Sequence, residues 1–190
     1  TECVHTNIGG AENVMQVALR SSTVQKVIAL STDKAVNPIN LYGATKLAAE
    51  KIMLAANNLA GKDGPRFSVC RYGNVIGSRG SVIPLFKRQV EQGIPPTITD
   101  HRMTRFMITM NDVVRMAEMT VDNMQGREIV VPKIPSMHIL DIAEAVAGDR
   151  RHDLIGIRPG EKLHETLLTE HEDPDGKGYT SETNDRWMTV

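Results

Sequence analysis

Early in this chain, two short apolar runs flank a long helical stretch, and their order limits the folds open to it. Residues 27–30, Val-Ile-Ala-Leu, have the length of a strand buried on both faces. Residues 41–57 are rich in Ala, Leu, Lys and Glu and predict a helix, with Asn40 as its N-cap. After a Gly/Pro turn, residues 66–72 predict a second strand. A strand, a helix and a strand in this order indicate the parallel sheet of an α/β protein.

The rest of the chain continues this alternation. A helix ends near Arg20, residues 31–40 form a polar loop, and a glycine-rich loop spans 73–81. The residues Thr-Met-Asn-Asp at 109–112 are a capping box for a helix that reaches position 123. The other predicted helices cover residues 84–92, 140–146 and 162–168, and the other predicted strands cover 97–99, 106–108, 128–131 and 154–157.

Composition and charge exclude several classes of function. The formal net charge is -1 and aromatic residues make up 4% of the chain, so neither a polyanion-binding surface nor a set of base-stacking platforms is indicated. We therefore expect no nucleic-acid partner. No apolar run approaches the length of a membrane span, so we expect no membrane partner either.

The cysteines and histidines give no sign of a disulfide or a metal site. Cys3 and Cys70 lie far apart, which favours a reducing compartment and predicts a cytoplasmic location. The six histidines show no zinc-ligand spacing, so no metal is expected. The ten methionines are interpreted as core filling, with Met116 and Met119 at helical spacing.

Two groups of residues in the first α/β segment could carry chemistry. Thr32, Asp33 and Lys34 directly follow the first predicted strand, and ligands of open α/β sheets bind at that edge. Tyr42 and Lys46 are four residues apart on the following helix, so both lie on one face. A nearby ammonium favours the phenolate and makes the tyrosine usable as a base. The alternative interpretations are an accidental surface pair for Tyr42 and Lys46 and an exposed loop ion pair for Asp33 and Lys34.

These segments resemble the inverting UDP-N-acetylglucosamine 4,6-dehydratases, which are extended short-chain dehydrogenase/reductases of the polysaccharide biosynthesis protein family. The resemblance covers nearly the whole chain. Its most diagnostic feature is the pair Asp33-Lys34, where many sugar dehydratases carry Asp-Glu. Membrane-anchored relatives that retain the C5 configuration commonly carry Met where this chain has Tyr42, so the resemblance favours a soluble, C5-inverting enzyme. The segments that carry the resemblance are 30–46, 71–81, 99–100, 102–106, 132–137 and 156–162.

The resemblance implies roles for the residues at the first site. Tyr42, assisted by Lys46, would take the proton of the C4 hydroxyl. Lys34 would be the base at C5, Asp33 the acid that protonates the departing C6 hydroxyl, and Thr32 would bind the sugar near C4.

The resemblance also implies the ligands. The cofactor is expected to be NADP, bound by Tyr42, Lys46, Tyr72, Asn74 and Val75. The substrate is expected to be a UDP-sugar, bound by Thr32, Asn74, Arg105 and Arg158. The two arginines are candidate diphosphate clamps or structural ion pairs. Glu161 is expected to organise a helix start.

The implied fold is the C-terminal part of a Rossmann-like, doubly wound parallel sheet with a smaller α/β substrate-binding region. We expect residues 1–82 to form the C-terminal half of an NADP-binding domain with the catalytic residues. Residues 83–170 would be mainly substrate-binding, and residues 171–190 a loop or tail, with a solvated acidic stretch at 171–175.

The family's Gly-x-x-Gly-x-x-Gly turn, which holds the dinucleotide phosphates, does not occur in this sequence. The chain is therefore interpreted as a fragment of a lyase that forms homo-oligomers when complete, and the fragment by itself is expected to be inactive. Two alternatives stay open. One is a nucleotide-sugar epimerase or reductase, against which Lys34 after Asp33 argues. The other is a non-catalytic chain that binds nucleotide-sugars.

Overall fold

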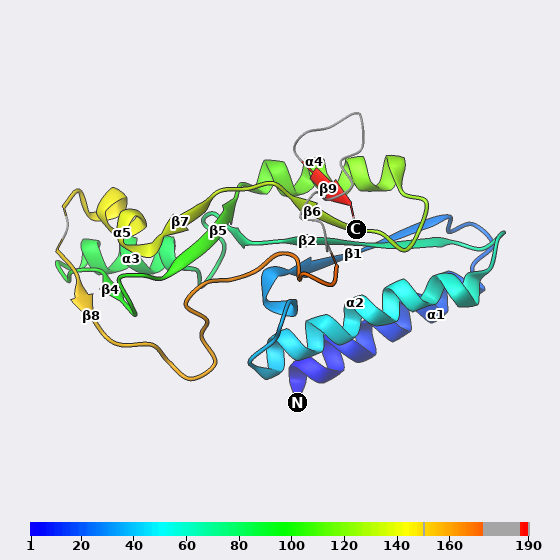
Figure 1. Ribbon diagram of the computed structural model, residues 1–190, viewed down its shortest axis with the longest axis horizontal. Helices are drawn as coiled ribbons and strands as arrows, with labels where there is room; N and C mark the ends of the chain where they lie inside the picture. The colour runs from blue at the N-terminus through cyan, green and yellow to red at the C-terminus, as the bar shows by residue number, and fades with distance from the viewer. Residues whose placement is uncertain (150, 173–186, 190) are drawn as a thin grey trace. The chain divides into compact units, whose positions relative to one another are not determined.

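The computed structural model describes residues 1–149, 151–172 and 187–189, which fall into two compact units (Figure 1). The first unit comprises Thr1–Tyr72, Asn111–Lys133 and the described residues from Thr166 onward. The second comprises Gly73–Met110 and Ile134–Glu165. The first unit is thus interrupted in sequence after Tyr72 and resumes at Asn111. The functional ranges 1–82 and 83–170 stay predictions.

The first unit is built on a sheet in the order β1-β2-β6-β9. The strands β1 (Lys26–Thr32), β2 (Arg66–Tyr72) and β6 (Ile129–Pro132) are parallel, and β9 (Trp187–Thr189) adds to β6 in the antiparallel direction. The register of β1 on β2 runs from Lys26 opposite Arg66 to Thr32 opposite Tyr72, so the two strands end side by side. The predicted parallel α/β sheet is confirmed.

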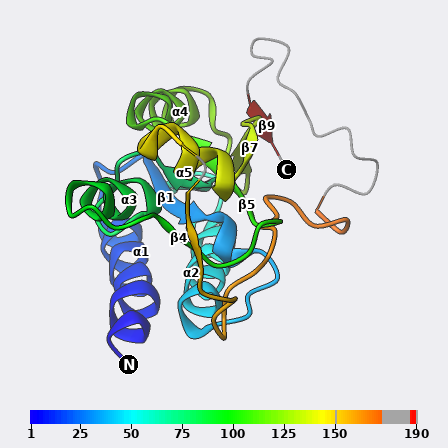
Figure 2. The ribbon, with the colours of Figure 1, turned by 90° about the vertical axis from the view of Figure 1, so that its left-hand side faces the viewer.

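Helices cover both faces of this sheet, as the doubly wound prediction requires (Figures 1 and 2). A π-helix, η1 (Val4–Gly9), leads into α1 (Gly10–Arg20), which lies beside α2 (Leu41–Ala60) on one face. On the other face lies α4 (Met110–Asn123). The predicted cap of α2 is confirmed, because the Asn40 side chain accepts a hydrogen bond from the Gly43 amide at 2.8 Å.

Side chains of the sheet and of α4 form the core of the first unit. Met116 is fully buried against Cys70 and Val130, with Ile28 and Met119 packed at the margin. The interpretation of Met116 as core filling is therefore confirmed.

The prediction that the first strand is buried on both faces is wrong. Val27 to Ala29 are half-buried and Leu30 is 47% exposed. Among the described strands, β1 pairs with β2 alone and forms an edge of the sheet, whereas β2 lies between two strands and buries Phe67 to Arg71.

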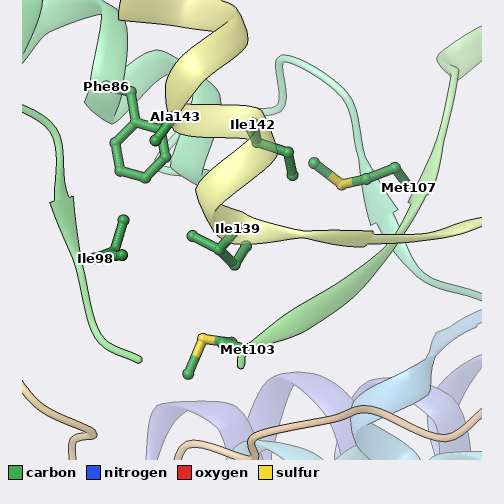
Figure 3. Packing of buried hydrophobic residues seen from close by; sticks show 7 residues of the cluster. All are labelled: Phe86, Ile98, Met103, Met107, Ile139, Ile142 and Ala143. Atoms are coloured by element: carbon green, nitrogen blue, oxygen red, sulfur yellow. The ribbon is translucent and has the colours of Figure 1, made fainter. Parts of the chain in front are cut away.

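The second unit is a smaller α/β arrangement. One sheet has the order β3 (Asn74–Val75), β5 (Thr104–Ile108), β7 (Ser136–His138), and a second pairs β4 (Thr97–Ile98) with β8 (Asp153–Leu154). The helices α3 (Val82–Glu91) and α5 (Ile139–Ala147) pack on each other. Figure 3 shows the core between them, formed by Phe86, Ile98, Met103, Met107, Ile139, Ile142 and Ala143.

The predicted helix over residues 162–168 is wrong, because this segment has no helical turn. Carbonyls of this segment accept hydrogen bonds from residues distant in sequence, and that of Leu163 is one a helix would use internally. Leu163 O accepts from the Thr104 amide at 3.1 Å, and Leu167 O accepts from Arg71 Nη1 at 2.8 Å. Two further segments predicted as irregular contain structure: a 3₁₀ turn, η2 (Asp33–Ala35), and the strand β9. The rest of the expected tail, residues 173–186 and 190, lies outside the described residues.

Within the part of the chain that the structure describes, no helix combines the length and apolar character that crossing a bilayer requires.

Asn57 on α2 makes a contact that yields a first prediction. Its side-chain amide is buried, accepts from the Phe67 amide at 3.0 Å and donates to the Phe67 carbonyl at 2.9 Å. Asn57→Ala leaves the buried Phe67 N–H without its acceptor, and we expect the free energy of unfolding to fall by about 1–3 kcal/mol.

Urea denaturation of the two variants Asn57→Ala and Asn58→Ala measures this effect. The neighbouring Asn58 is exposed and accepts from the exposed Arg127, so its loss should change stability by about 0.5 kcal/mol at most. Equal effects of the two substitutions would contradict the prediction.

Candidate functional site

The end of β1 gathers three of the predicted catalytic residues. Thr32 Oγ1 and Lys34 Nζ both donate hydrogen bonds to Asp33 Oδ1, at 2.9 and 3.0 Å. Asp33 is fully buried, whereas the Lys34 side chain is 33% exposed. Asp33 Oδ2 is buried and accepts no hydrogen bond from the described residues. Since the carboxylate is enclosed, the alternative of an exposed loop ion pair is wrong.

The helix α2 brings the Tyr-Lys pair to the same end of β1. Lys46 Nζ donates to the Leu30 carbonyl of β1 at 2.7 Å. Burial lowers the pKa of Lys46, and the Glu50 carboxylate one turn further partly offsets this by raising it. Tyr42 lies in the first turn of α2 and is 46% exposed. A partly buried cation and an accessible phenol on one helix face fit proton transfer to a bound ligand.

Two neighbours of Tyr42 complete the surroundings. Tyr72 ends β2 opposite Thr32, and its pKa is raised by burial and further by the nearby Cys70 and Tyr42. Thr45 is buried on α2, donates to the Tyr42 carbonyl at 2.8 Å and accepts from Asn7 Nδ2 of η1 at 3.0 Å. The first unit therefore brings together six of the predicted residues: Thr32, Asp33, Lys34, Tyr42, Lys46 and Tyr72.

A glycine allows α2 to approach the loop after β1. A Cβ atom on Gly43 would lie 2.3 Å from the Lys34 carbonyl oxygen and 3.0 Å from Pro38 Cβ. Real side chains do not approach backbone oxygens so closely. The glycine after Tyr42 is thus required for the contact between the helix and the Asp33-Lys34 turn.

The second unit holds a pocket of about 200 Å³ in which Asn74, Arg105 and Arg158 meet. Arg105 Nη1 is held by the carbonyls of Thr104 at 2.7 Å and Leu163 at 3.2 Å. Apolar side chains line the remainder of the pocket: Val82, Leu85, Phe86, Ile98, Met103, Ile139 and Ile155. Guanidinium groups beside an apolar wall suit a ligand with phosphates and a planar ring.

Two other predicted residues behave differently. Val75 pairs with Ile108 between β3 and β5 and does not line this pocket. Glu161 lines the pocket, and its Oε2 accepts from the Arg158 amide at 3.3 Å across a turn. No helix starts there, so the expected role of Glu161 in a helix start is wrong.

A buried ion network was missed by the sequence analysis. Arg71 at the end of β2 is fully buried and binds Glu50 through Nε at 3.1 Å and Nη2 at 2.7 Å. It also binds both oxygens of Glu172, each at 2.9 Å. Glu50 Oε1 accepts in addition from Ser31 Oγ at 2.5 Å. The acidic stretch expected to be solvated thus supplies a buried arginine with its second partner.

The charges in this network shift each other's protonation. Burial alone would lower the pKa of Arg71, but its hydrogen bonds to Glu172 and Glu50 outweigh burial and raise the pKa above the ordinary value. For Glu172, burial raises the pKa, while bonds from Arg71 and Thr169 lower it to about 2. The available signal was an arginine directly after the apolar residues Val69 and Cys70 of a predicted strand, since a buried guanidinium needs carboxylate partners.

With this geometry established, the comparisons with known proteins identify the family. Residues 1–184 match the polysaccharide biosynthesis protein family. The chain belongs to that family. Over 169 residues it is 54% identical to a UDP-N-acetylglucosamine 4,6-dehydratase (inverting) of Campylobacter jejuni, which confirms the predicted resemblance. Over 172 residues it is 40% identical to a UDP-glucose 4-epimerase of Rickettsia canadensis.

Each of these alignments covers 88% of the chain and 50% of the relative, so the chain spans about half the length of the curated relatives it matches. Among solved structures, Pen from Bacillus thuringiensis has a TM-score of 0.81 and 37% identity, covering 87% of this chain and 54% of that one. A dTDP-glucose 4,6-dehydratase from Streptomyces venezuelae with NAD bound has a TM-score of 0.76. At 18% identity, over 90% of this chain and 60% of that one, it shares the fold alone.

The close approach at Gly43 yields a second prediction. Gly43→Ala should destabilise the protein by about 1–3 kcal/mol, because either α2 or the Lys34 turn must move to admit the methyl group. Gly10→Ala is the control, since Gly10 is helical and nothing lies within 4 Å of the place that its methyl group would occupy. There we expect a gain of about 0.4–1 kcal/mol from the lower entropy of the unfolded chain. Thermal unfolding that shows the same sign for both would contradict this.

The ion pair of Glu172 yields a third prediction, on acid stability. The pKa of Glu172 falls from 4.5 to about 2 on folding, so its contribution is complete above pH 4.5 and is lost as the pH falls toward 2. Because the carboxylate is partly solvated, we expect a contribution of about 1 kcal/mol. Urea midpoints measured from pH 6 to 2 should fall less steeply below pH 4.5 in Glu172→Gln than in the wild type. If the urea midpoints of the wild type and of Glu172→Gln fall in parallel with pH, the ion pair of Glu172 with Arg71 does not contribute to the pH dependence of stability.

Proposed function

We propose that this chain supplies the proton-transfer residues and the nucleotide-sugar pocket of an NADP-dependent 4,6-dehydratase. Its substrate would be UDP-N-acetylglucosamine, and its product a UDP-2-acetamido-2,6-dideoxy-4-hexulose inverted at C5. The observation that carries the proposal is the enclosed Asp33, bonded through one oxygen to Thr32 and Lys34 beside the Tyr42-Lys46 helix. The identity with the Campylobacter jejuni dehydratase supports the same reaction class.

The Asp33-Lys34 bond can produce the acid and the base that dehydration needs. Lys34 as an ammonium cannot take a proton, and Asp33 as a carboxylate cannot give one. Transfer of one proton across their 3.0 Å hydrogen bond yields a neutral amine and a carboxylic acid.

The side chains then act in order. Tyr42, with Lys46 stabilising its phenolate, takes the C4 hydroxyl proton, and Thr32 holds the sugar near C4. The ketone at C4 acidifies the C5 hydrogen, which Lys34 removes. Asp33 protonates the C6 hydroxyl, which leaves as water. A solvent proton that reaches C5 on the face opposite Lys34 gives the inverted product, Tyr42 returns its proton to solvent, and Lys34 and Asp33 are left as ammonium and carboxylate.

Bound NADP would supply hydride acceptance at C4 and hydride return at C6. The residues present fit the nicotinamide end of such a cofactor, since Tyr42, Lys46 and Tyr72 gather at the carboxyl ends of parallel strands. Asn74 and Val75 stay predicted cofactor residues. The sequence holds no glycine turn for the diphosphate, and the choice of NADP over NAD rests on the resemblance of the Asp33-Lys34 segment.

The pocket of the second unit is proposed to bind the UDP part. Arg105 and Arg158 would pair with phosphate oxygens, and Asn74 would bond the nucleotide-sugar. The fixed Nη1 of Arg105, held by two carbonyls, favours a preorganised contact over a flexible one. The homo-oligomeric assembly and the cytoplasmic location stay predictions.

A second candidate function is epimerisation at C4, favoured by the 40% identity with the Rickettsia canadensis epimerase. An epimerase needs the Tyr-Lys pair but no acid-base pair for C5 and C6. Epimerisation releases no water and leaves the composition of the sugar unchanged, whereas dehydration produces a 4-keto-6-deoxy sugar. Product analysis therefore distinguishes the two reactions. A chain that only binds nucleotide-sugars would give neither product.

The fourth prediction tests the dehydration. The coding sequence that contains this chain is expressed in full and incubated with UDP-N-acetylglucosamine and catalytic NADP, and the product is identified by NMR. We expect the 4-keto-6-deoxy sugar, with kcat lowered about 10²–10⁴-fold in Lys34→Ala and in Tyr42→Phe, because each removes a proton-transfer group. The 190-residue chain by itself, which contains no Gly-x-x-Gly-x-x-Gly turn, should give no product.

Lys51→Ala serves as the matched control for Lys34→Ala. Lys51 is an exposed lysine on α2, and its loss should leave kcat unchanged. Product that persists in Lys34→Ala would remove Lys34 from the mechanism. A 4-epimer in place of the keto sugar would establish the second candidate.

A further inference from the structure

One face of α2 is tied to the end of β1 by two consecutive residues of the strand. Lys46 Nζ binds the Leu30 carbonyl at 2.7 Å, and Glu50, one turn further, accepts from Ser31 Oγ at 2.5 Å. Positions 46 and 50 are four apart, so both face the strand. Ser31 is 5% exposed and Glu50 1%, so their hydrogen bond does not compete with water, whereas the contact of Lys46 with Leu30 is exposed. Together the two contacts fix the position of α2 along its axis and its rotation about that axis relative to the end of β1.

Ser31 directly precedes the residues that the proposed dehydration uses. Thr32, Asp33 and Lys34 follow it without a break, and the η2 turn begins at Asp33. β1 is an edge strand among the described strands, so hydrogen bonds to β2 hold it from one side. The Ser31 hydroxyl adds a hydrogen bond from β1 to α2, in a direction different from that of the bonds to β2.

Glu50 is itself immobilised, which makes it a firm anchor for Ser31. Arg71 donates two hydrogen bonds to Glu50, and it also donates to Glu172 and to the Leu167 carbonyl. Removal of the Ser31 hydroxyl leaves this ion network complete. The strand end loses its tie to α2, while Glu50 Oε1 keeps its hydrogen bond from Arg71 Nε.

We propose that Ser31 is a positioning residue, whose hydrogen bond to Glu50 keeps the Thr32–Lys34 turn in place relative to Tyr42 and Lys46. The inference rests on the proposed dehydration. Proton transfers at C4, C5 and C6 of one sugar require both groups to meet the same ligand, and a displacement of about 1 Å can cost about 10²-fold in rate. Ser31 touches no reacting atom in this scheme and acts through the turn that follows it.

The chain offers a matched control for this role. Ser68 on β2 is fully buried and donates to Glu128, so it repeats the pairing of a strand serine with a carboxylate. Ser68 lies opposite Ile28 in the register, three positions before the pair of Ser31 and Arg71. It is thus distant from the turn that carries Asp33 and Lys34.

The fifth prediction compares Ser31→Ala with Ser68→Ala in the complete protein, with kcat and KM measured for the dehydration. Both should lower the melting temperature. Ser31→Ala should lower kcat about tenfold with KM changed less than twofold, while Ser68→Ala keeps both at wild-type values. Amide hydrogen exchange at residues 32–34 should accelerate at least fivefold in Ser31→Ala only.

Wild-type kcat in Ser31→Ala, or equal losses of kcat in the two variants, would overturn the positioning role. If the wild type itself gives no dehydration product, the proposed function fails, and hydrogen exchange still decides whether the hydroxyl holds the turn. Equal exchange at 32–34 in both variants would then show that it does not.

Discussion

The first unit depends on a guanidinium buried at the end of its central strand. Arg71 belongs to β2, yet its contacts reach α2 through Glu50 and the segment 166–172 through Glu172 and the Leu167 carbonyl. An isolated buried charge of this kind would cost several kcal/mol, so the carboxylates are required once the arginine is in place. Removing one partner of such a group typically costs about 3–5 kcal/mol. The network therefore defines which segments must lie at the carboxyl end of the sheet.

Three polar side chains of α2 bond the sheet, although the helix also buries Ala49, Met53 and Ala56. Asn57 bonds the start of β2, Glu50 bonds Ser31 and Arg71, and Lys46 bonds Leu30. Apolar contacts tolerate small slides of a helix, whereas hydrogen bonds of fixed geometry do not. We infer that α2 is held in a defined register on β1 and β2, which is what a Tyr-Lys pair needs if it is to meet a turn on the neighbouring strand.

Local features of the fold could be predicted from the sequence because nearby residues determine them. The Asn40 cap, the strands around 27–30 and 66–72, and the common face of Tyr42 and Lys46 follow from spacing and residue type. The burial of Asp33 could not be predicted, because it depends on how the turn closes against α2 at Gly43. The helix expected over 162–168 failed for the same kind of reason. Its carbonyls are used by Thr104 and Arg71, residues distant in sequence, and tertiary contacts override propensity there.

The charges at the ends of β1 and β2 bear on the proposed chemistry. Three carboxylates, those of Asp33, Glu50 and Glu172, stand with three cations, those of Lys34, Lys46 and Arg71. Arg71 pairs with both Glu50 and Glu172, and Lys46 lies close enough to Glu50 to interact with its charge. In the proposed mechanism, movement of one proton from Lys34 to Asp33 leaves the sum of charges at this end of the sheet unchanged. The hydrogen bonds of Arg71 to Glu50 and Glu172 would hold the neighbouring charges in place during that transfer, and fixed dipoles and charges stabilise a transition state without a reorganisation cost.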